Sequence, residues 1–233
     1  MSIPFAAIDD YKRAAAECAI ALLGDGMVVG LGSGSTAEFA LGALARRIGE
    51  GLRITGVPTS DRIAALAGRL GVPLTDLGTR PIDVAIDGAD EIERGTLNLI
   101  KGGGGSLVRE KLVARASRRF VVIADDRKLV DRLGNRGKLP VVLLPFARTL
   151  ALHRLDALGI AATLRRLNGR EVVTDDGLLI ADCVCHNIGD AAALAARLAA
   201  VPGVVDSGLF LGLASEAIVA GAGGVHVIAP ISA

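Results

Sequence analysis

Two carboxylates and a lysine follow apolar runs near the middle of the sequence. Asp87 and Asp90 lie in the segment DGADE, directly after the run Asp83–Ile86, and Lys101 follows the run Leu97–Ile100. If these runs are strands of a parallel sheet, their carboxyl ends form the edge at which such sheets bind ligands. The sequence therefore predicts a charged crevice, with the alternative that both aspartates only cap the backbone of a turn.

Four consecutive glycines, Gly102 to Gly105, come between Lys101 and the expected helix Ser106–Ser117. A glycine loses more conformational freedom on folding than any other residue, so a run of four is costly. A flexible linker could contain such a run, but this one lies between an apolar strand and a helix. Its place favours close approach of the backbone to a ligand, and we expect Gly102 and Gly103 to contact substrate.

Glu110, in the same expected helix, has no basic residue within one helical turn. The positions three and four residues away hold Ser106, Leu107, Val113 and Ala114. The surface ion pair that often accounts for a helical glutamate therefore has no local partner. A carboxylate in this situation can face a substrate and act as a general base.

A second glycine-rich segment, GLGSGSTA at 30–37, follows the expected strand Met27–Leu31. Backbone N–H groups and hydroxyls at a helix start form an anion site. The segment also fits a dinucleotide fingerprint, but the next strand runs into Pro58-Thr59-Ser60 where that fingerprint needs an acid. A single phosphate fits better, and a tightly packed turn is the alternative. The predicted phosphate-binding residues are Ser33, Gly34, Ser35 and Thr36.

The composition excludes several classes of protein. Hydrophobic residues make up 51% of the chain and 30 residues are glycine, which rules out intrinsic disorder. Lys and Arg number 26 against 25 Asp and Glu, so the basic excess of a nucleic-acid-binding protein is missing. With five Phe, one Tyr and no Trp, the chain also lacks aromatic residues for stacking on bases. We expect a small-molecule substrate and no nucleic-acid partner.

The first residues show no secretory signal, because no basic segment is followed by an apolar run. Three cysteines do not make a disulfide scaffold in a chain of this length. The tail Gly208–Ala233 has Glu216 as its one charged residue, but glycines interrupt it, which favours short buried pieces over a membrane span. We expect a cytoplasmic protein that does not associate with membranes.

The elements that must position these residues alternate between strands and helices through residue 133. This order predicts an α/β fold, with a mostly parallel Rossmann-like sheet and helices on both of its faces. Either Thr59 or Ser60 is expected to cap the third helix. The expected strands are Met27–Leu31, Leu52–Val57, Ile82–Ile86, Leu97–Ile100 and Phe120–Ala124, and the expected helices are Asp9–Leu23, Thr36–Ile48, Ser60–Leu70 and Ser106–Ser117.

After residue 133 the order becomes β-α-β-β-α-β, which is typical of a smaller α+β domain of the split-βαβ, ferredoxin-like kind. We expect a catalytic domain at 1–133, this small domain at 134–206, and a segment at 207–233 that returns to the first domain. The expected strands are Leu139–Leu144, Ala162–Arg166, Glu171–Thr174, Leu178–Cys185 and Val204–Leu211, the helices are Ala147–Leu158 and Ala191–Ala200, and a hairpin turn is expected at Asp176-Gly177.

Together, a phosphate-binding loop, two aspartates, a lysine and a glutamate suit an aldose–ketose isomerase that acts on a phosphorylated sugar. Such a reaction needs a base for the proton next to the carbonyl and a positive charge to stabilise the enediolate. The segment Cys183-Val184-Cys185-His186 could suggest a metal site, but on a strand His186 points away from both cysteines and no second cluster completes four ligands. We therefore expect no metal and no cofactor.

Four segments resemble ribose-5-phosphate isomerase of the type A family: GLGSGSTAEF, DGADEIERGTLNLIKGGGGSLVREKLVA, FVVIADDRKLVDRLG and PGVVDSGLF. The resemblance runs from about Lys12 to the tail. It implies interconversion of D-ribose 5-phosphate and D-ribulose 5-phosphate in the non-oxidative pentose phosphate pathway, without metal or organic cofactor, by a homodimer or homotetramer. One departure is that the loop reads GSGST where GTGST is common in the family, although Ser33 keeps a hydroxyl.

The resemblance also implies roles for single residues. Glu110 would move the proton between C1 and C2, while Asp87 would assist ring opening and handle hydroxyl protons. Asp90 and Lys101 would hold and stabilise the enediolate. Contacts with the phosphate and sugar would come from Ser35 and Thr36 with neighbouring loop amides, and from Lys12 and Lys128.

Two other functions remain open from the residues alone. An amino-sugar phosphate deaminase with a related crevice would lack the lysine and four glycines after DGADE. A sugar-phosphate sensor would need neither Glu110 nor Lys101, and would carry a DNA-binding helix-turn-helix. The arginine pairs Arg118-Arg119 and Arg165-Arg166 are expected to be solvated rather than to bind phosphate.

Overall fold

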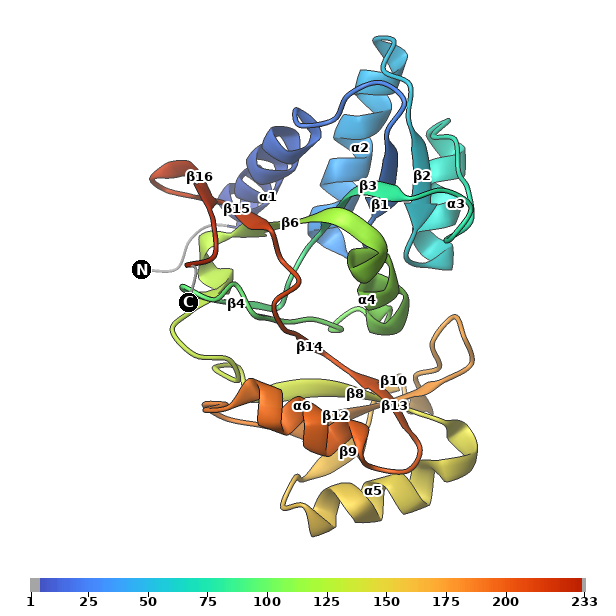
Figure 1. Ribbon diagram of the computed structural model, residues 1–233, viewed down its shortest axis with the longest axis vertical. Coiled ribbons are helices and arrows are strands. Elements are labelled where there is room, and N and C mark those ends of the chain that lie inside the picture. Colours follow the sequence, from blue (N-terminus) through green and yellow to red (C-terminus); the bar gives the residue numbers. More distant parts are fainter. Residues whose placement is uncertain (1–4, 232–233) are drawn as a thin grey trace.

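In the computed structural model, which describes residues 5–231, apolar runs from both ends of the chain form one central sheet of order β16-β15-β6-β3-β1-β2 (Figure 1). Every neighbouring pair is parallel except the hairpin of β15 with β16. This arrangement confirms the mostly parallel sheet predicted from the alternation of strands and helices. Its strands are β1 (Val28–Leu31), β2 (Thr55–Pro58), β3 (Ile82–Asp87), β6 (Ser117–Asp125), β15 (Glu216–Gly221) and β16 (Gly224–Ile228).

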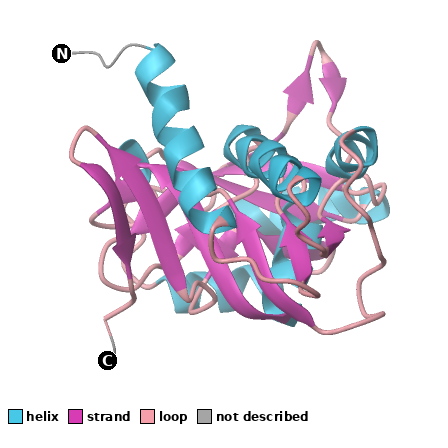
Figure 2. Cartoon of the chain, turned by 90° about the horizontal axis from the view of Figure 1, so that it is seen from above, coloured by secondary structure: helices cyan, strands magenta, loops and turns pink. Residues whose placement is uncertain are grey.

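Helices cover both faces of the central sheet (Figure 2). On β3, Val84 and Ile86 face the core that contains three helices, and Ala85 between them faces the other core. Because successive side chains of a strand point to opposite faces, two covered faces require a continuous apolar run. One face carries α1 (Phe5–Ile20), α2 (Ser35–Gly49) and α3 (Asp61–Arg69), and the other carries α4 (Leu107–Ala116).

The start of α3 settles one of the alternatives left by the sequence. The Ser60 hydroxyl accepts a hydrogen bond of 3.2 Å from the backbone N–H of Ile63, which is the usual geometry of a helix N-cap. Ser60, and not Thr59, is therefore the capping residue.

The second half of the chain forms an antiparallel sheet of order β13-β8-β12-β9, below the central sheet in Figure 1. Its strands alternate with two helices in the order β-α-β-β-α-β, as predicted for a ferredoxin-like layer. The elements are β8 (Lys138–Leu143), α5 (Arg148–Ala157), β9 (Ala162–Leu164), β12 (Leu179–Val184), α6 (Ala191–Ala199) and β13 (Val204–Ser207), with the 3-10 turn η2 (Pro145–Ala147) before α5.

A third small sheet, of order β14-β5-β4-β7, lies between the other two and was not predicted. The run that ends at Ile100 belongs to this sheet and pairs antiparallel with its neighbours, so its expected place in the parallel sheet was wrong. The strands are β4 (Glu91–Glu93), β5 (Leu99–Ile100), β7 (Leu129–Val130) and β14 (Leu209–Phe210), and the 3-10 turn η1 (Asp126–Lys128) precedes β7.

The expected single strand Val204–Leu211 is also wrong, because the chain changes sheets at Gly208. A Cβ atom on Gly208 would lie 2.3 Å from the carbonyl oxygen of Lys101. The backbone of Gly208 also donates to the carbonyl of Pro140 at 2.7 Å and accepts from the N–H of Lys101 at 2.9 Å. Close backbone approach therefore divides the run into β13 and β14.

The expected strands Ala162–Arg166 and Glu171–Thr174 differ from the structure for a local reason. The chain leaves the antiparallel sheet after Leu164 and forms a separate hairpin of β10 (Arg166–Leu167) with β11 (Arg170–Glu171). Asn168 and Gly169 form its turn with positive φ angles of 51° and 77°, as the common two-residue hairpin turn requires. The predicted turn at Asp176-Gly177 is confirmed, since the N–H of Gly177 donates to the carbonyl of Thr174.

The tail from Gly208 onward folds as short strands. Ile218 and Val219 of β15 are buried in the two opposite cores of the central sheet, and β15 runs parallel to β6. Within residues 5–231, no helix combines the length and apolar character needed to cross a membrane.

Candidate active site

The predicted site residues gather around a cavity of about 180 Å³ at the carboxyl ends of β1, β3 and β6. Eleven of the twelve line it: Lys12, Ser33, Gly34, Ser35, Thr36, Asp90, Lys101, Gly102, Gly103, Glu110 and Lys128. The twelfth, Asp87, lies behind the cavity wall and contacts Lys101. The lining also includes five residues that were not among the predicted site residues: Gly88, Ala89 and Gly104 from the segments already described, and Asp125 and Arg127.

Lys101 joins the two carboxylates that flank it. Its Nζ atom lies 2.9 Å from Oδ2 of Asp87 and 3.2 Å from Oε2 of Glu110, and it donates to the carbonyl of Gly88 at 2.6 Å. All three charged side chains are at most 5% exposed. The structure thus brings together three groups from β3, the end of β5 and α4, as the sequence predicts for a charged crevice.

The two carboxylates are not equivalent. Asp87 accepts hydrogen bonds from the backbone N–H groups of Ser33 and Gly88, in addition to its ion pair with Lys101. Oε2 of Glu110 has no partner with hydrogen-bond geometry among the described residues, although Lys101 lies at ion-pair distance. Donors favour the ionised form of a carboxyl group, and Asp87 has more of them than Glu110 does. Glu110 is therefore the carboxyl group with more freedom to exchange a proton with a ligand.

Burial accounts for the ionisation behaviour of Glu110. The pKa of Glu110 is raised from 4.5 to about 8, because desolvation and the charge of Asp87 together outweigh the lowering effect of Lys101. Desolvation also raises the pKa of Asp87, whereas its bonds to Lys101, Gly88 and Ser33 oppose the rise. A pKa near neutrality is what a general base requires, because it can both take up and release a proton.

Asp90 supports the four-glycine loop from the cavity side. Its Oδ2 atom accepts a hydrogen bond of 2.7 Å from the N–H of Gly103, and a Cβ on Gly103 would lie 2.8 Å from Oδ1 of Asp90. Gly102 has a φ of 107°, which disfavours any other residue there. Asp90 is therefore a capping residue of this loop as well as a lining residue of the cavity.

The loop at residues 33–36 combines an anion site with tight packing. α2 begins at Ser35, at the lining of the cavity. The backbone N–H groups of its first turn have no acceptor within the helix, so they can bind an anion in the cavity. The hydroxyl of Ser33 instead lies 2.8 Å from the hydroxyls of both Thr59 and Ser60. Ser33 is thus bonded to the protein, and Ser35 and Thr36 carry the hydroxyls left for a ligand.

Two glycines of the glycine-rich segment at 30–37 are required by packing rather than by a ligand. A Cβ on Gly32 would lie 2.3 Å from Cγ of Asp87, and one on Gly30 would lie 2.5 Å from a methyl group of Val113. The alternative of a tightly packed turn is therefore correct for these two positions. Gly34 differs, because a Cβ there would meet nothing within 4 Å and its φ is 97°.

Cationic side chains line another part of the cavity. Lys12 pairs with Asp9 at 3.1 Å, whereas Lys128 forms no ion pair with any residue described by the structure. Burial, together with the nearby charge of Arg136, lowers the pKa of Lys128. Arg127 and the fully buried Asp125 pair through Nε and Oδ1 at 2.6 Å. The sequence signal that could have identified Asp125 and Arg127 is the charged run DDRK at 125–128, which follows an apolar strand.

One arginine expected to be solvated is not. Nη1 of Arg165 donates to the carbonyls of Gly102 at 2.8 Å and Gly103 at 3.0 Å, and the side chain is 16% exposed. The expectation treated Arg165 and Arg166 as one solvated pair, and it is correct for Arg166, whose side chain is 63% exposed. The sequence could not show that β9 ends next to the glycine loop.

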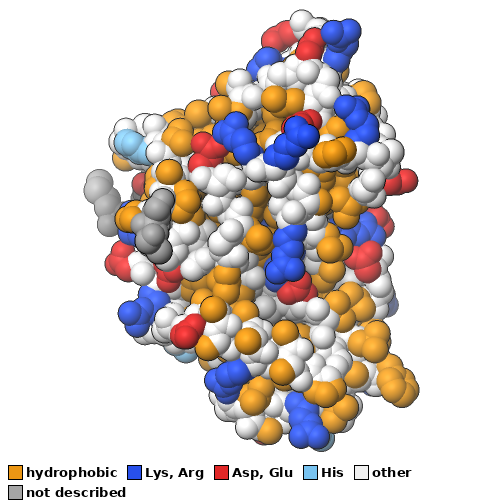
Figure 3. All heavy atoms as spheres, viewed as in Figure 1, with side chains coloured by type: hydrophobic (Ala, Val, Ile, Leu, Met, Phe, Trp, Pro, Cys, Tyr) orange, Lys and Arg blue, Asp and Glu red, His pale blue; other side chains and the backbone are white. Residues whose placement is uncertain are grey.

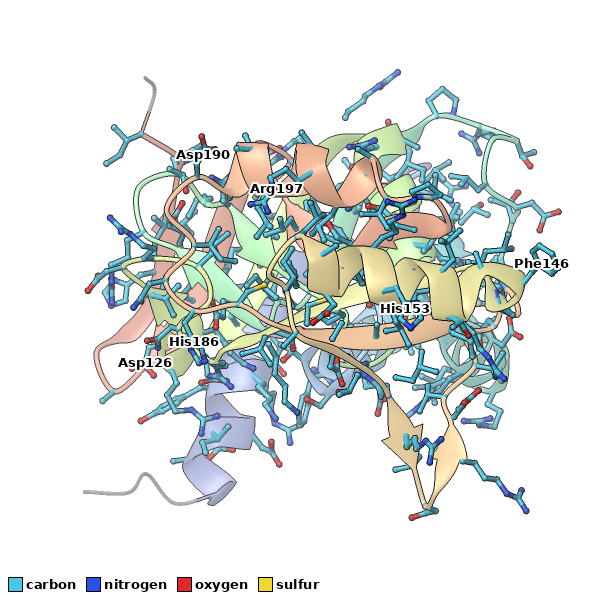
Figure 4. The ribbon with its side chains drawn as sticks, turned by 90° about the horizontal axis from the view of Figure 1, so that it is seen from below. Asp126, Phe146, His153, His186, Asp190 and Arg197 are labelled. Carbon is cyan, nitrogen blue, oxygen red and sulfur yellow. The ribbon has the colours of Figure 1, made fainter. Side chains whose placement is uncertain are left out.

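The histidines do not converge on a second site. Figure 4 shows His153 on α5 and His186 well apart from it at the other side of the molecule. Among the residues that the structure describes, no group of three or more His, Cys, Asp or Glu side chains could hold a metal ion. Cys183 is buried in the antiparallel sheet, where desolvation raises the pKa of its thiol to about 12.

Comparison with known proteins agrees with this geometry. The family model described as ribose 5-phosphate isomerase A (phosphoriboisomerase A) matches residues 55–224. A ribose-5-phosphate isomerase A of Gloeobacter violaceus is 48% identical over 227 residues, covering 97% of this chain and 99% of that protein. One from a Roseiflexus species is 52% identical over 219 residues, covering 92% and 94%. The solved structure of ribose 5-phosphate isomerase A from Methanocaldococcus jannaschii has a TM-score of 0.91 at 39% identity, over 95% of this chain and 99% of that one. The chain therefore belongs to the ribose 5-phosphate isomerase A family.

Proposed function

We propose that this chain interconverts D-ribose 5-phosphate and D-ribulose 5-phosphate through an enediolate, with Glu110 as the base. The observation that carries the proposal is the position of Glu110, which lies buried beside Lys101 in a cavity that also holds the start of α2. A proton acceptor, a fixed positive charge and an anion site are the three parts that this isomerisation needs.

The phosphate of the substrate binds at the start of α2 in this proposal. The N–H groups of the first turn, the positive end of the helix dipole and the hydroxyls of Ser35 and Thr36 all favour an anion there. Lys12 and Lys128 add positive charge to the same cavity. Anchoring the phosphate directs the other end of a five-carbon chain toward Glu110 and Lys101.

Glu110 moves one proton between two adjacent carbons of the open-chain sugar. Its ionised carboxylate removes the proton from C2 of the aldose, and the electron pair of that bond forms the C1–C2 double bond of the enediolate. The former carbonyl oxygen on C1 gains the negative charge, which Lys101 stabilises. Return of the proton from Glu110 to C1, with transfer of the hydroxyl proton from O2 to O1, gives the ketose.

In this proposal Asp87 handles the hydroxyl protons, and Asp90 helps Lys101 to hold the enediolate. Asp87 keeps Lys101 charged and oriented through its 2.9 Å ion pair, and it also assists ring opening. Asp90 holds the glycine loop through Gly103 and lines the cavity. Both roles use groups of the chain alone, in line with a family that needs neither metal nor organic cofactor.

An assay of the purified protein with ribose 5-phosphate tests the proposal, with ribose and allose 6-phosphate as controls. We expect formation of ribulose 5-phosphate from the first substrate and little or no turnover of the other two. Ribose lacks the anchoring phosphate, and allose 6-phosphate is one carbon longer. Equal turnover of ribose and ribose 5-phosphate would contradict the phosphate site, and no ketose from any of them would contradict the proposed activity.

We further propose a cytoplasmic homodimer or homotetramer, divided into units at 1–133, 134–206 and 207–233. Support for association comes from apolar side chains on the surface of the antiparallel layer, where Figure 3 shows hydrophobic side chains exposed among charged ones. Leu144, Phe146 and Leu150 are 46%, 97% and 48% exposed, and Figure 4 shows Phe146 in the turn η2, beside the start of α5. Light scattering on the purified protein would measure the number of chains.

A further inference from the structure

Arg165 connects the antiparallel layer with the loop that lines the cavity. It follows β9, yet its Nη1 atom donates to the carbonyl oxygens of Gly102 and Gly103, at 2.8 and 3.0 Å. Gly102 and Gly103 lie 63 and 62 positions before Arg165 in the sequence. With 16% of its side chain exposed, Arg165 is held in place rather than free in solvent.

Asp182 holds the other side of the same guanidinium group. Nε of Arg165 donates to both carboxylate oxygens of Asp182, at 3.2 and 3.1 Å, and Nη2 donates to Oδ1. Asp182 lies on β12, which pairs directly with β9, so a sheet supports the pair. Paired hydrogen bonds between an arginine and a carboxylate fix the plane of the guanidinium group. The arginine therefore reaches the glycine loop in a defined orientation.

Other hydrogen bonds already hold parts of the glycine loop: Asp90 accepts from the N–H of Gly103, and the N–H of Gly105 donates to the carbonyl of Gly102. The peptide between Gly103 and Gly104 is the one whose carbonyl Arg165 holds. A Cβ on Gly104 would meet nothing within 4 Å, so no packed neighbour fixes this residue. Behind the loop, a second hollow of about 380 Å³ is lined by Gly103 and Arg165 among others. Gly103 lines both cavities and thus forms a thin wall between them. A run of glycines in a thin wall can adopt other peptide orientations.

The contact with Arg165 determines where the next N–H group points. In a trans peptide the C=O and N–H bonds are antiparallel, and the described residues contain no cis peptide bond. Since the carbonyl of Gly103 points toward Arg165, the N–H of Gly104 points the opposite way, toward the substrate cavity that Gly104 lines. Among the described residues this N–H has no acceptor.

We propose that Arg165 is a positioning residue for the isomerisation, and that it holds the N–H of Gly104 toward the negatively charged oxygen of the enediolate. A backbone donor fixed before the reaction stabilises charge that develops in the transition state. Arg165 does not touch the substrate, because it acts from the opposite side of the loop. The inference rests on the proposed function and adds Arg165, Asp182 and the N–H of Gly104 to it.

The test compares Arg165→Ala with Arg166→Ala, a neighbouring arginine whose side chain is 63% exposed. Removal of one preorganised donor lowers kcat by about 10²–10³-fold. For Arg165→Ala we expect a smaller loss, of about 10- to 100-fold, because the N–H of Gly104 remains and the loop still visits the active orientation. KM should change by less than about 3-fold, since ground-state binding is not affected. Arg166→Ala should retain the kcat of the unaltered protein.

Addition of millimolar guanidinium ion gives a readout that a general loss of structure would not produce. The hollow behind the loop leaves room for the ion beside Asp182, so kcat of Arg165→Ala should rise with guanidinium concentration. If Arg165→Ala does not fold, Arg165→Lys and Asp182→Asn replace it. Lysine cannot bond Asp182 and two carbonyls in one plane, so its kcat should also fall at unchanged KM.

Unchanged kcat in a folded Arg165→Ala or Arg165→Lys variant would overturn the inference, as would a loss confined to KM. A kcat lowered equally by Arg166→Ala would overturn it as well, because the effect would then be one of surface charge. The unaltered protein is assayed alongside: absence of its turnover would contradict the proposed function itself, whereas normal turnover with unaffected variants contradicts the role of Arg165 alone.

Discussion

Oε2 of Glu110 lies 3.2 Å from Nζ of Lys101 but forms no hydrogen bond with any described residue. Lys101 therefore acts on this carboxylate chiefly through its charge. A buried carboxylate oxygen without a well-aligned hydrogen bond is costly for the folded state. In the proposed reaction that oxygen is free to take a proton from carbon, which explains why the cost is retained.

Replacement of Glu110 by Gln should lower kcat by about 10²–10⁴-fold, as expected for loss of a general base. Glutamine has nearly the same shape but cannot take up a proton at working pH. KM should stay close to that of the unaltered protein, since the phosphate site and Lys101 remain. Steady-state kinetics with ribose 5-phosphate measures both values, and unchanged turnover would remove Glu110 from the mechanism.

The activity of the unaltered protein should increase with pH up to a plateau. Burial raises the pKa of Glu110 to about 8, and only the ionised carboxylate can act as a base. The profile of kcat/KM reports the ionisation of the free enzyme, so its rising limb should have a midpoint near 8. A profile that is already flat from pH 5 upward would show that a different group, or none, limits the reaction.

The same shift predicts a pH-dependent stability difference between Glu110→Gln and the unaltered protein. A glutamate in the unfolded chain ionises near 4.5, and Glu110 in the folded protein ionises near 8. Between these values the folded state holds a proton that the unfolded chain has released. The resulting stabilisation is therefore complete below 4.5 and is lost as the pH rises through 8.

Chemical denaturation of both proteins at several pH values measures this effect. The free energy of unfolding of the unaltered protein should fall, relative to that of Glu110→Gln, as the pH rises from 4.5 to 8. Glutamine does not titrate, so the difference reports the ionisation of Glu110 together with its effect on the neighbouring Asp87 and Lys101. Parallel pH dependences of the two proteins would mean that Glu110 ionises normally in the folded state.

Replacement of Gly32 by Ala should weaken the fold and the activity together. The added Cβ would lie 2.3 Å from Cγ of Asp87, and Asp87 orients Lys101. Inserting a methyl group into a packed site costs about 1–3 kcal/mol. Gly42→Ala is the matched control, because a Cβ in this part of α2 meets nothing within 4 Å.

The control should be as stable as the unaltered protein, or more stable by up to about 1 kcal/mol, because alanine favours a helix. Thermal unfolding and steady-state kinetics compare the two variants. A Gly32→Ala protein with normal stability and kcat would mean that Asp87 can move without effect on Lys101.

The sequence predicted the large elements well because their signals are local. Strand β1 and the inner parts of β3 and β6, Val84–Ile86 and Phe120–Ala124, are buried on both faces and read as continuous apolar runs. The small sheet that includes β5 was missed, since two-residue strands have too few residues for a periodic pattern. The break at Gly208 was missed because it depends on the backbone of Lys101, more than 100 positions earlier in the chain.

By itself, the sequence determined which residue types stand at the strand ends: the DGADE segment, Lys101 with its four glycines, and Glu110 on the following helix. Residue type and order along the chain are enough to predict an anion site, a charge and a base. Only the tertiary structure decided which polar atoms are left unpaired. The hydroxyl of Ser33 is bonded to Thr59 and Ser60, Oε2 of Glu110 is not bonded, and Arg165 reaches across from another sheet. Hydrogen-bond partners and burial depend on contacts between distant segments, so no local pattern in the sequence contains them.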